Sequence, residues 1–596
     1  MAISSTQLAR VHTQLNQIMK QINAGNLQSA GTAITQLVRK YPALGETNHV
    51  ASGYFTQIKE QDRAIYYAQR ALKADPTNPG YLVALGVLLV QINKHETAIG
   101  HLEQALKIDP KTPQAKGVLA VSYTQLGKVA KARAMFNQAI ADSPDDHESA
   151  MNLALLESDI GNANKAVEMM QRLITRFPDN PVLHDSLCMF ATYDDQLSPS
   201  EVFDIHKQFG NCIQSRVRAP KSYTNDPDPN RKIKLGFISP DFIQHSIVYF
   251  LEPIFKNIDR TKFEICMYFT ATRADETTNT LESQADIWRH CSAGMAQAHK
   301  QVVQDQVDVL FELTGHFASN LLPIFAAKPS PVSISTIGYA NTTGLDTVDA
   351  RIIDSITDPS PQADTLATEK LIRIDNCFLC YAPPANAPAV EQSLPDRPFT
   401  FGSFNDLRKI SPSTLNTWSE ILLANPNAVL MLKSSRFGDH EVCEEFTTRF
   451  KDRGIDPSRL ILKGRTQTLQ EHLAMYNQID CALDTFPYTG TTTTCESLWM
   501  GVPVITLTGN THAGRVGASL LHAVGLDELV TNEHQAYIDC ATSKAKQGSP
   551  STNDRIALRA QMQSSPLLDA PTYTKKFESI IQDLWSSWCQ KQGASK

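Results

Sequence analysis

"IDCALDTFPYTGTTTTCESLWMGVPVITLTG", residues 479–509, is the stretch that decides the fold. The two apolar runs at its ends, 479–485 and 503–509, have the length and composition of buried strands. Between them, a turn with proline and glycine leads into four threonines and then into a short helix, which Gly501 ends. Parallel strands need such a crossover helix, and helices then cover both faces of the sheet. The stretch therefore predicts an α/β domain.

The four threonines, Thr491 to Thr494, stand at the start of that helix. The first amides of a helix have no intrahelical partner and the helix dipole makes that end positive, so a phosphate can bind there. Threonine hydroxyls add donors without adding charge, and Glu496, about one turn further on, could accept bonds from ribose hydroxyls. We therefore expect Thr491, Thr492 and Thr493 to hold a diphosphate. The alternative is that one threonine caps the helix and the others fill space.

Two series of apolar runs follow one another after residue 232. The first comprises 233–239, 263–269, 307–313 and 331–339, and the second comprises 399–405, 428–434, 459–464, 479–485 and 503–509. A proline-rich segment, 381–398, separates them. Helical stretches lie between the runs, so each series predicts a Rossmann-like lobe with a parallel sheet. Ligands bind beyond the carboxyl ends of such strands, and we expect the site in the cleft between the lobes.

Three candidate residues follow predicted strands. Lys409 lies after the first strand of the second lobe and could neutralise a leaving diphosphate, although an isolated lysine is usually a surface residue. His245 lies after the first strand of the first lobe and could be a general base or a hydrogen-bond donor. His316 follows the run at 307–313 and has the same roles open to it. The alternative for either histidine is a place in a cap or in the core.

The N-terminal part has a 34-residue repeat. Four columns keep this spacing: prolines at Pro42, Pro76, Pro110, Pro144 and Pro178; alanines at Ala30, Ala64, Ala98, Ala132 and Ala166; small or apolar residues at Leu37, Ala71, Ala105, Ala139 and Leu173; turn residues at Gly25, Lys59, Asn93, Gly127 and Gly161. Small residues let two helices touch, and proline ends the second helix because it cannot donate to the helical ladder. We assign residues 1–180 to five tetratricopeptide repeats.

Such an array is a solenoid whose concave face binds extended peptides, so we expect protein partners in its groove. The alternative is a scaffold or a dimerisation surface, which would make the protein a homodimer. Related arrays line the groove with asparagines, but the matching positions here are Val50, Ala84, Val118 and Asn152. A regular asparagine ladder is therefore absent.

The rest of the chain divides at changes of composition. We expect degenerate helices, capped at Ser200, and a polar linker over 181–231, the first lobe over 232–390, the second over 391–550 and C-terminal helices over 551–596. The fold class is thus an all-α tetratricopeptide solenoid followed by two Rossmann-like α/β lobes.

The composition excludes several classes of protein. The net charge of −7 over 596 residues argues against nucleic acid or an anionic membrane surface as the main partner. No apolar run approaches 18 residues, and the N-terminus lacks the pattern of a signal peptide. The 11 cysteines are scattered, mostly in apolar runs, which is typical of reduced thiols in a cytoplasmic protein. A lone Cys377-x-x-Cys380 is weak evidence for a metal site, and we expect no metal.

Several motifs resemble one known family. They are "PDFIQHSIVYFLEP", "ELTGHFASN", "IGYANTTGL", "NCFLCYAPP", "FGSFNDLRKISPSTL", "EHLAMY", "DTFPYTGTTTTCESLWMGVPVITL" and "HAGRVGASLL". With the repeats in front, the chain resembles the O-linked N-acetylglucosamine transferase and SPINDLY family, glycosyltransferase family 41. The resemblance implies a GT-B fold and a metal-independent transfer of a sugar from a nucleotide diphosphate to protein Ser or Thr hydroxyls. No cofactor is implied, because the nucleotide sugar is a co-substrate.

The resemblance also assigns roles by position. His245 matches the family histidine that serves as base or positions the acceptor, and Lys409 matches the lysine that stabilises the diphosphate. The matched donor-binding residues are Gln467, whose backbone would lie at the base edge, His472, which would stack on the base, Thr491, Thr492 and Thr493 at the phosphate, and Glu496 at the ribose. His316, Thr342 and Arg515 lie in matching motifs and are expected to line the active site.

Departures from the animal enzymes leave the donor open. Those enzymes have His at Thr491, Lys at Leu469, Gln at Asp406 and Pro at Ser246. "HSIVYF", "ELTGH", "FLCY" and "TTTTCES" are more similar to the plant SPINDLY proteins, which use GDP-fucose. UDP-N-acetylglucosamine is the first expectation for the donor and GDP-fucose the alternative. Asp406 would contact the donor sugar or pair with Lys409, three residues away.

We expect an inverting transfer in which the acceptor hydroxyl attacks in line as the diphosphate leaves. His245 is the first candidate to take the hydroxyl proton, and the diphosphate itself is the rival. A different class of function is a non-catalytic scaffold with the same fold. The retained Lys409, His245 and Glu496 favour an enzyme.

Overall fold

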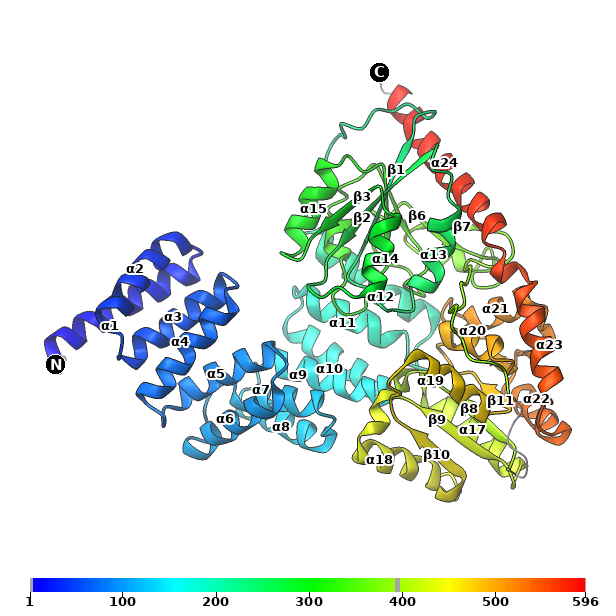
Figure 1. Ribbon diagram of the computed structural model, residues 1–596, viewed down its shortest axis with the longest axis horizontal. Helices are drawn as coiled ribbons and strands as arrows, with labels where there is room; N and C mark the ends of the chain where they lie inside the picture. Colours follow the sequence, from blue (N-terminus) through cyan, green and yellow to red (C-terminus); the bar gives the residue numbers. More distant parts are fainter. Residues whose placement is uncertain (1–3, 392–396, 595–596) are drawn as a thin grey trace. The chain divides into compact units, whose positions relative to one another are not determined.

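The computed structural model describes residues 4–391 and 397–594 (Figure 1). It contains two compact units, Met1–Leu156 and Glu157–Lys596. Its first four helix pairs are α1 Ser5–Asn23 and α2 Leu27–Lys40, α3 Gly45–Gln57 and α4 Gln61–Ala74, α5 Pro79–Gln91 and α6 His95–Ile108, and α7 Ala115–Gln125 and α8 Val129–Asp142. A fifth pair is α9 His147–Asp159 and α10 Ala163–Arg176, and a sixth is α11 Pro181–Ala191 and α12 Pro199–Gln214.

The repeat columns have the predicted roles. The five alanines from Ala30 to Ala166 are fully buried between the paired helices. All five turn residues from Gly25 to Gly161 have positive φ, which closes the tight turn between the paired helices. Each second helix ends two residues before its proline, as at Lys40 before Pro42. The tetratricopeptide prediction is confirmed.

The sixth pair begins with a cap that differs from the predicted one. Ser198, not Ser200, is the N-cap of α12, because its side chain accepts from the amide of Glu201 while the Glu201 carboxylate accepts from the amide of Ser198. Pro199 takes the first helical position, which fixes the start of the helix one residue before Ser200.

The boundary between the two compact units falls after Leu156, inside α9, and is a different boundary from the end of the repeats, which the sequence predicts at residue 180. The reason lies in contacts between the last helices and the second lobe. The Arg449 guanidinium donates to the Ile160 carbonyl at 2.9 Å and to the Asn162 side chain at 3.0 Å. The amide of Ser413 donates to the Asp195 carboxylate at 2.8 Å. The end of the helical array is therefore part of the same compact unit as the lobes.

The same helices also pack on the first lobe. The Asp185 carboxylate on α11 accepts from Asn320 at 2.7 Å. On α12, Gly210 meets the turn at Gly344 so closely that a Cβ at position 210 would lie 1.7 Å from the Gly344 carbonyl oxygen. Backbone thus contacts backbone at this point, and only glycine allows it.

The first lobe holds one parallel sheet with the order β3-β2-β1-β4-β5-β6-β7. The strands are β1 Ile233–Ser239, β2 Phe263–Phe269, β3 Ile287–His290, β4 Val309–Glu312, β5 Val332–Ser335, β6 Ala350–Ile353 and β7 Lys370–Arg373. Between them lie α13 Val248–Asn257, α14 Glu276–Gln284, α15 Met295–Gln304, α16 Leu322–Ala326 and the 3₁₀ turn η1 Ala363–Thr365. Sequence analysis found β1, β2, β4 and β5 but missed β3, β6 and β7, each of which is interrupted by an arginine.

The second lobe repeats this plan with the order β10-β9-β8-β11-β12-β13. Its strands are β8 Thr400–Ser403, β9 Val429–Lys433, β10 Leu460–Lys463, β11 Cys481–Leu483, β12 Val504–Leu507 and β13 Val530–Thr531. Its helices are η2 Leu407–Lys409, α17 Pro412–Ala424, η3 Ser435–Gly438, α18 His440–Lys451, η4 Pro457–Arg459, α19 Leu469–Ala474, η5 Met475–Gln478, α20 Thr492–Trp499, α21 Val516–Val524, η6 Asp527–Leu529 and α22 His534–Gln547. All five predicted strands are present, and β13 was missed.

The strand orders locate the ligand cleft. In each sheet the connections turn in opposite directions from one central pair, β1 and β4 in the first lobe and β8 and β11 in the second. Ligands of open α/β sheets bind at the carboxyl ends of such a pair. His245 follows β1, His316 follows β4, Lys409 follows β8 and the threonine run follows β11.

The C-terminal helices connect the lobes. After α23 Thr552–Gln563 and η7 Pro566–Leu568, the long helix α24 Ala570–Ala594 lies beside α13 of the first lobe (Figure 1). The Glu578 carboxylate accepts from the amide of Asp259, and the Trp585 indole donates to the Asp228 carbonyl. Among the described residues, no helix is long and apolar enough to cross a membrane.

The contact at Gly210 gives a test of how α12 is held. Gly210→Ala would place a methyl group on the Gly344 carbonyl, and we expect the free energy of unfolding to fall by about 1–3 kcal/mol, as for overpacked cores. Gly100→Ala is the matched control, since no atom lies within 4 Å of its added Cβ, and it should stabilise its helix by about 0.5–1 kcal/mol. Urea unfolding measures both. Equal stability of Gly210→Ala and wild type would show that α12 can shift freely.

Candidate active site

One buried carboxylate organises the turn between β11 and α20, residues 484–491, which we call the phosphate turn. Asp484 is 1 % exposed and accepts from the amide of Gly490 at 2.6 Å, the amide of Thr485 at 2.9 Å and the Thr506 hydroxyl at 2.9 Å. A Cβ at position 490 would lie 2.6 Å from the Thr494 hydroxyl. The turn therefore needs glycine at 490 and an acceptor at 484.

The four threonines have different surroundings. Thr494 is buried and fills space beside Gly490, and the Thr493 hydroxyl donates to the Asn405 side chain at 2.8 Å. Thr491 is the N-cap residue of α20 but makes no side-chain cap, and both Thr491 and Thr492 are only half-buried. Two hydroxyls and the first amides of α20 are thus available to a phosphate, whereas Thr493 can offer its amide alone.

Lys409 lies against this turn. Its Nζ donates to the Thr489 carbonyl at 2.8 Å and lies 4.2 Å from the centre of the Tyr488 ring. Burial lowers the pKa of Lys409 to about 8, although the carboxylates of Asp484 and Asp406 oppose that shift. The lysine is therefore a desolvated cation at neutral pH, held directly beside the helix start where a phosphate would lie.

Asp406 pairs with Arg408 and not with Lys409, so of its two expected roles the contact with the donor sugar stays a prediction. Its carboxylate accepts from the Arg408 Nε at 3.0 Å and from the Arg408 amide at 3.0 Å, and so caps the short η2 turn. Burial favours its neutral form, but Arg408 outweighs that effect and the pKa of Asp406 lies below its ordinary value. Arg408 also lies 3.9 Å from Asp159 of the helical array. The pairing leaves the Lys409 ammonium free of a carboxylate contact within 4 Å among the described residues.

Two tyrosines that sequence analysis missed join the helical array to the phosphate turn. Tyr193, in the loop after α11, stacks on Tyr488 with ring centroids 5.1 Å apart and ring planes 23° apart. Tyr488 is the ring over which Lys409 lies. The sequence feature that could have indicated Tyr488 is its position in the motif "FPYTG". The array thus contacts the residue that supports the candidate lysine.

His472 is fixed by two charged groups. Its Nε2 lies 2.9 Å from the Glu496 carboxylate, and its Nδ1 lies 2.7 Å from the Lys433 ammonium. Since an ammonium only donates, Nδ1 is the acceptor and the ring proton is assigned to Nε2. Tyr476 adds a hydrogen bond to Glu496 at 3.2 Å. Lys433, at the end of β9, is a residue that sequence analysis missed.

The other predicted donor-binding residues lie at the start of α19. The amide of Gln467 donates to the Glu471 carboxylate at 2.9 Å, so only its carbonyl is available to a base. Leu469 is the first residue of α19 and is half-buried. Thr468 caps this helix in a capping box with Glu471, which fixes the backbone on both sides of the cap.

His245 lies in the first lobe, in the loop before α13. Its side chain is exposed, and its Nδ1 accepts from the amide of Ile247 at a long 3.4 Å. In this tautomer Nε2 carries the proton and is available as a donor. Burial raises the pKa of the nearby Asp241. The structure thus favours a donor role for His245.

His316 lies in the core, with partners on both ring nitrogens. Nδ1 lies 2.7 Å from the Asp185 carboxylate and Nε2 lies 3.1 Å from the Thr343 carbonyl. Both partners are acceptors, so both nitrogens carry protons. Burial opposes this charge, but the hydrogen bond to the Asp185 carboxylate favours it, and the pKa of His316 lies above its ordinary value. His316 therefore links α11 to the first lobe.

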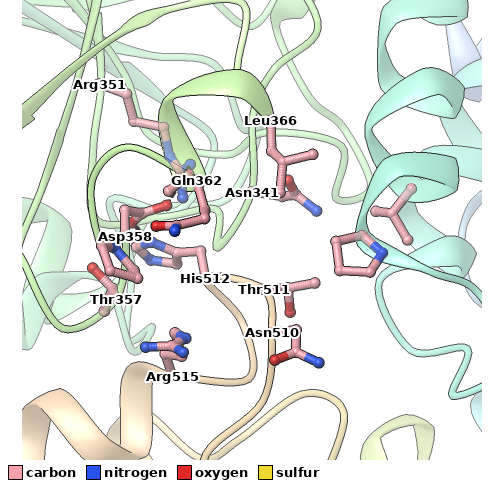
Figure 2. A pocket seen from close by; sticks show the side chains of 14 residues that line it. Asn341, Arg351, Thr357, Asp358, Gln362, Leu366, Asn510, Thr511, His512 and Arg515 are labelled. Carbon is pink, nitrogen blue, oxygen red and sulfur yellow. Dashed lines mark hydrogen bonds and ion pairs between the residues drawn. The ribbon is translucent and has the colours of Figure 1, made fainter.

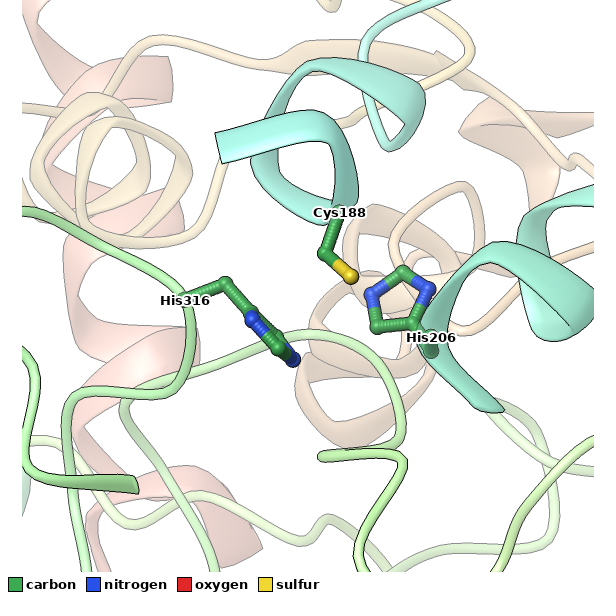
Figure 3. A group of neighbouring side chains, drawn as sticks. All are labelled: Cys188, His206 and His316. Atoms are coloured by element: carbon green, nitrogen blue, oxygen red, sulfur yellow. The ribbon is translucent and has the colours of Figure 1, made fainter. Parts of the chain in front are cut away.

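The cluster of Cys188, His206 and His316 has ligand atoms within 4.8 Å of one another (Figure 3). The bonds already made there do not suit a metal. His206 contacts the Val202 carbonyl at 2.7 Å and the Tyr339 hydroxyl at 2.8 Å, and a doubly protonated His316 has no lone pair to offer. Burial raises the pKa of the Cys188 thiol. We assign this cluster to the core.

Thr342 and Arg515 lie in different places. The Thr342 hydroxyl is buried and donates to the Glu369 carboxylate at 2.6 Å, which holds the "NTTGL" turn. The Arg515 guanidinium donates to the Ile356 carbonyl at 3.2 Å and lines a pocket between the lobes (Figure 2). The geometry gives both residues structural contacts and brings neither to Lys409.

Comparison with known proteins adds to this geometry. The model of "Glycosyl transferase family 41" matches residues 204–381 and 388–577, and that of "Tetratricopeptide repeat" matches 60–122, 93–156 and 123–187. A "Probable UDP-N-acetylglucosamine--peptide N-acetylglucosaminyltransferase SPINDLY" of Petunia hybrida is 37% identical over 404 residues, 67% of this chain and 43% of that protein. A protein of Arabidopsis thaliana with the same printed description but named SEC is 28% identical over 376 residues, 61% of this chain and 38% of that protein. The chain spans less than half the length of these curated relatives.

A solved structure shares the fold. The structure of a point mutant of the O-GlcNAc transferase of Thermobaculum terrenum superposes with a TM-score of 0.79 at 29% sequence identity, over 86% of this chain and 98% of that one. The match spans most of both chains, so the predicted combination of tetratricopeptide repeats and two Rossmann-like lobes is confirmed.

The lowered pKa of Lys409 predicts a gain in stability when its charge is removed. A lysine whose folded pKa lies below its unfolded value costs stability below about pH 8, and the cost disappears above about pH 10.5. We expect Lys409→Met to raise the free energy of unfolding at pH 7 by about 1–3 kcal/mol. Urea unfolding at pH 7 and pH 9.5 measures it, with Lys451→Met on the surface as control. A less stable Lys409→Met protein at pH 7 would contradict the burial of an unpaired cation.

Proposed function

The chain belongs to glycosyl transferase family 41, and we propose that it is a protein O-glycosyltransferase that transfers N-acetylglucosamine from UDP-N-acetylglucosamine to Ser and Thr hydroxyls. One observation supports this most directly: the Lys409 ammonium lies on the phosphate turn, at the start of α20. The printed names of the relatives, which contain UDP-N-acetylglucosamine, support the proposed sugar and base.

We infer that the diphosphate of the donor binds at this helix start. The amides of Thr492 and Thr493, the hydroxyls of Thr491 and Thr492 and the Lys409 ammonium would all contact it. Bond cleavage leaves a further negative charge on the diphosphate, so a fixed cation and fixed amides stabilise the transition state more than the bound donor. Because the chain supplies these donors itself, the proposed transfer is independent of a metal.

The nucleoside is proposed to lie over the group of Lys433, His472 and Glu496. Lys433 and Glu496 fix the plane of the imidazole, which can then stack on a base at little entropic cost. Glu496 also lies close enough to the helix start to accept from a ribose hydroxyl while bonded to His472. The Gln467 carbonyl is the atom left to contact the base edge.

The transfer is proposed to be inverting. The acceptor oxygen forms its bond to the anomeric carbon as the bond from that carbon to the diphosphate oxygen breaks, and the hydroxyl proton passes to a diphosphate oxygen. His245, with Nε2–H available as a donor, would orient the acceptor hydroxyl rather than take its proton. The diphosphate is therefore the base in this proposal, although His245 was our first candidate.

The proposal also includes protein partners that bind the repeats. Protein acceptors would reach the cleft through the groove of the repeats, whose last helices contact Tyr488 through Tyr193. A homodimer through the repeats is the alternative use of that surface. A cytoplasmic location fits the 11 cysteines, all of which are free.

GDP-fucose is the second candidate donor. The chain is more similar to the SPINDLY-named relatives, at 37% identity, than to the SEC-named relative, at 28%. Motifs around His245 and Thr491 also resemble the SPINDLY proteins. The phosphate turn and Lys409 would serve either diphosphate equally, so only the base site separates the two donors.

Thermal unfolding with four ligands tests the donor. UDP and UDP-N-acetylglucosamine, at 100 times their dissociation constants, should each stabilise the protein by about 2.7 kcal/mol, and GDP and GDP-fucose should not. His472→Ala should weaken UDP and its sugar conjugate alike, whereas His440→Ala, at an exposed site on α18, should change neither. Tight binding of GDP with no binding of UDP would replace the first donor by the second.

Turnover tests the role of Lys409. Lys409→Met should lower kcat by about a hundredfold or more, because the lost interaction grows as the leaving group gains charge. The variant should still fold, and slow release of free sugar without acceptor should fall in parallel. An unchanged kcat would remove Lys409 from the reaction. Absence of sugar release even in the wild type would favour the non-catalytic scaffold.

A further inference from the structure

A second site lies away from the donor-binding residues. A pocket of about 370 Å³ is formed where the N-terminus of α12, the loop after β6 and the loop before α21 meet (Figure 2). It is lined by Pro199, Val202, Asn341, Arg351, Thr357, Asp358, Pro359, Gln362, Ala363, Leu366, Asn510, Thr511, His512 and Arg515. Neither Lys409, nor Glu496, nor any threonine of the phosphate turn is among them.

His512 offers a buried acceptor in this pocket. The histidine is 6 % exposed, and its Nδ1 lies 2.5 Å from the Asp358 carboxylate. Burial opposes the charge of Asp358, but the hydrogen bond from His512 and the charge of Arg351 hold the pKa of that carboxyl well below its ordinary value, and burial lowers the pKa of His512, which keeps its ring neutral. Nδ1 therefore donates to a carboxylate, and Nε2 keeps its lone pair. Among the described residues, this buried Nε2 has no hydrogen-bond partner.

Two arginines offer positive charge. Arg351 is 3 % exposed, its Nη1 is 3.9 Å from Asp358, and its Nη2 is buried without a hydrogen-bond partner in the part of the chain that the structure describes. Arg515 is half-buried and uses one nitrogen on the Ile356 carbonyl. Asp358 is the one carboxylate on the pocket wall, so the lining has one positive charge in excess. Figure 2 shows Arg351, Asp358 and His512 together on one wall, with Arg515 beside them.

Unpaired buried groups cost about 1–3 kcal/mol each, and two in one pocket imply a ligand that satisfies both. We propose that this pocket binds a compact anion that has a hydroxyl group close to its charged group. The hydroxyl donates to His512 Nε2, and the charged group contacts Arg351 and Arg515. Pro199, Val202 and Leu366 give an apolar side for the carbon skeleton. Hydroxy carboxylates and sugar phosphates both have this chemistry.

The site is distinct from the proposed donor site but shares a wall with it. The loop that holds His512 also pairs with the phosphate turn, since the amide and the hydroxyl of Thr489 donate to the Ala513 carbonyl at 3.0 and 2.9 Å. A nucleotide therefore serves as an internal control. It should bind whether or not the pocket is altered.

Isothermal titration with four probes tests the ligand class. Lactate and ribose 5-phosphate represent the two sources, and propanoate and ribose each lack one of the two groups. We expect lactate to bind about tenfold or more tightly than propanoate, or ribose 5-phosphate to bind about tenfold or more tightly than ribose. Tenfold is the loss of affinity expected for one hydrogen bond to a charged group. The tighter of the two identifies the source. No binding by either, or equal binding by the truncated probes, would overturn the proposal.

Two variants test the residues. His512→Asn keeps a donor for Asp358 but removes the Nε2 acceptor, and Arg515→Met removes a half-buried charge. Each variant should lower the affinity for the probe that binds the wild type about tenfold. Arg218→Met, at an exposed arginine outside the pocket, is the matched control and should not. The thermal shift with UDP or GDP checks that each variant is folded. Unchanged probe affinity in both folded variants would show that binding occurs elsewhere.

Discussion

The site of the second lobe depends on the carboxylate of Asp484. It lies at the end of β11 and accepts from the phosphate turn through Gly490 and from β12 through Thr506. Asn405, after β8, lies 3.4 Å from it, and a Cβ at position 517 of α21 would lie 2.5 Å from it. Burial raises its pKa, while these donors and Lys409 oppose the shift. This one buried carboxylate thus links β8, β11 and β12 to the phosphate turn, and it also places a negative charge near Lys409.

The end of the helical array is the second support of the same site. Tyr193 stacks on Tyr488. Arg408 pairs with Asp406, so that Asp406 does not pair with Lys409, and Arg408 also lies near Asp159 of α9. These contacts explain why the compact unit with the lobes begins at Glu157 rather than after the fifth repeat. A repeat that packs only on its neighbours has no such requirement. The last helices are therefore as much a part of the candidate active site as of the solenoid.

Features with a period or a fixed spacing could be predicted from the sequence, and features that depend on distant pairs could not. The proline and turn columns predicted where the helices end, because the same local backbone constraints recur in every repeat. The nine strands found lie in longer apolar runs of the sequence, whereas β3, β6 and β7 are each interrupted by an arginine and stand in no such run. Lys433 and Tyr193 were missed because their roles come from residues 39 and 295 positions away, His472 and Tyr488. For His316 the sequence left a core location and a catalytic role both open, because its partner Asp185 lies 131 residues before it.

The threonine run follows from the electrostatics of Lys409. An ammonium without a carboxylate partner is already costly to bury, and burial lowers its pKa to about 8. Further basic side chains at the start of α20 would lower it more and leave the lysine neutral, so it could not stabilise a leaving diphosphate. Acidic side chains would raise it but would repel the phosphates. Neutral hydroxyls at Thr491 and Thr492, together with helix amides, add donors while leaving the lysine charged. Under the proposed function, a run of hydroxyls is therefore the composition that would leave the charge of the half-buried Lys409 available to the diphosphate.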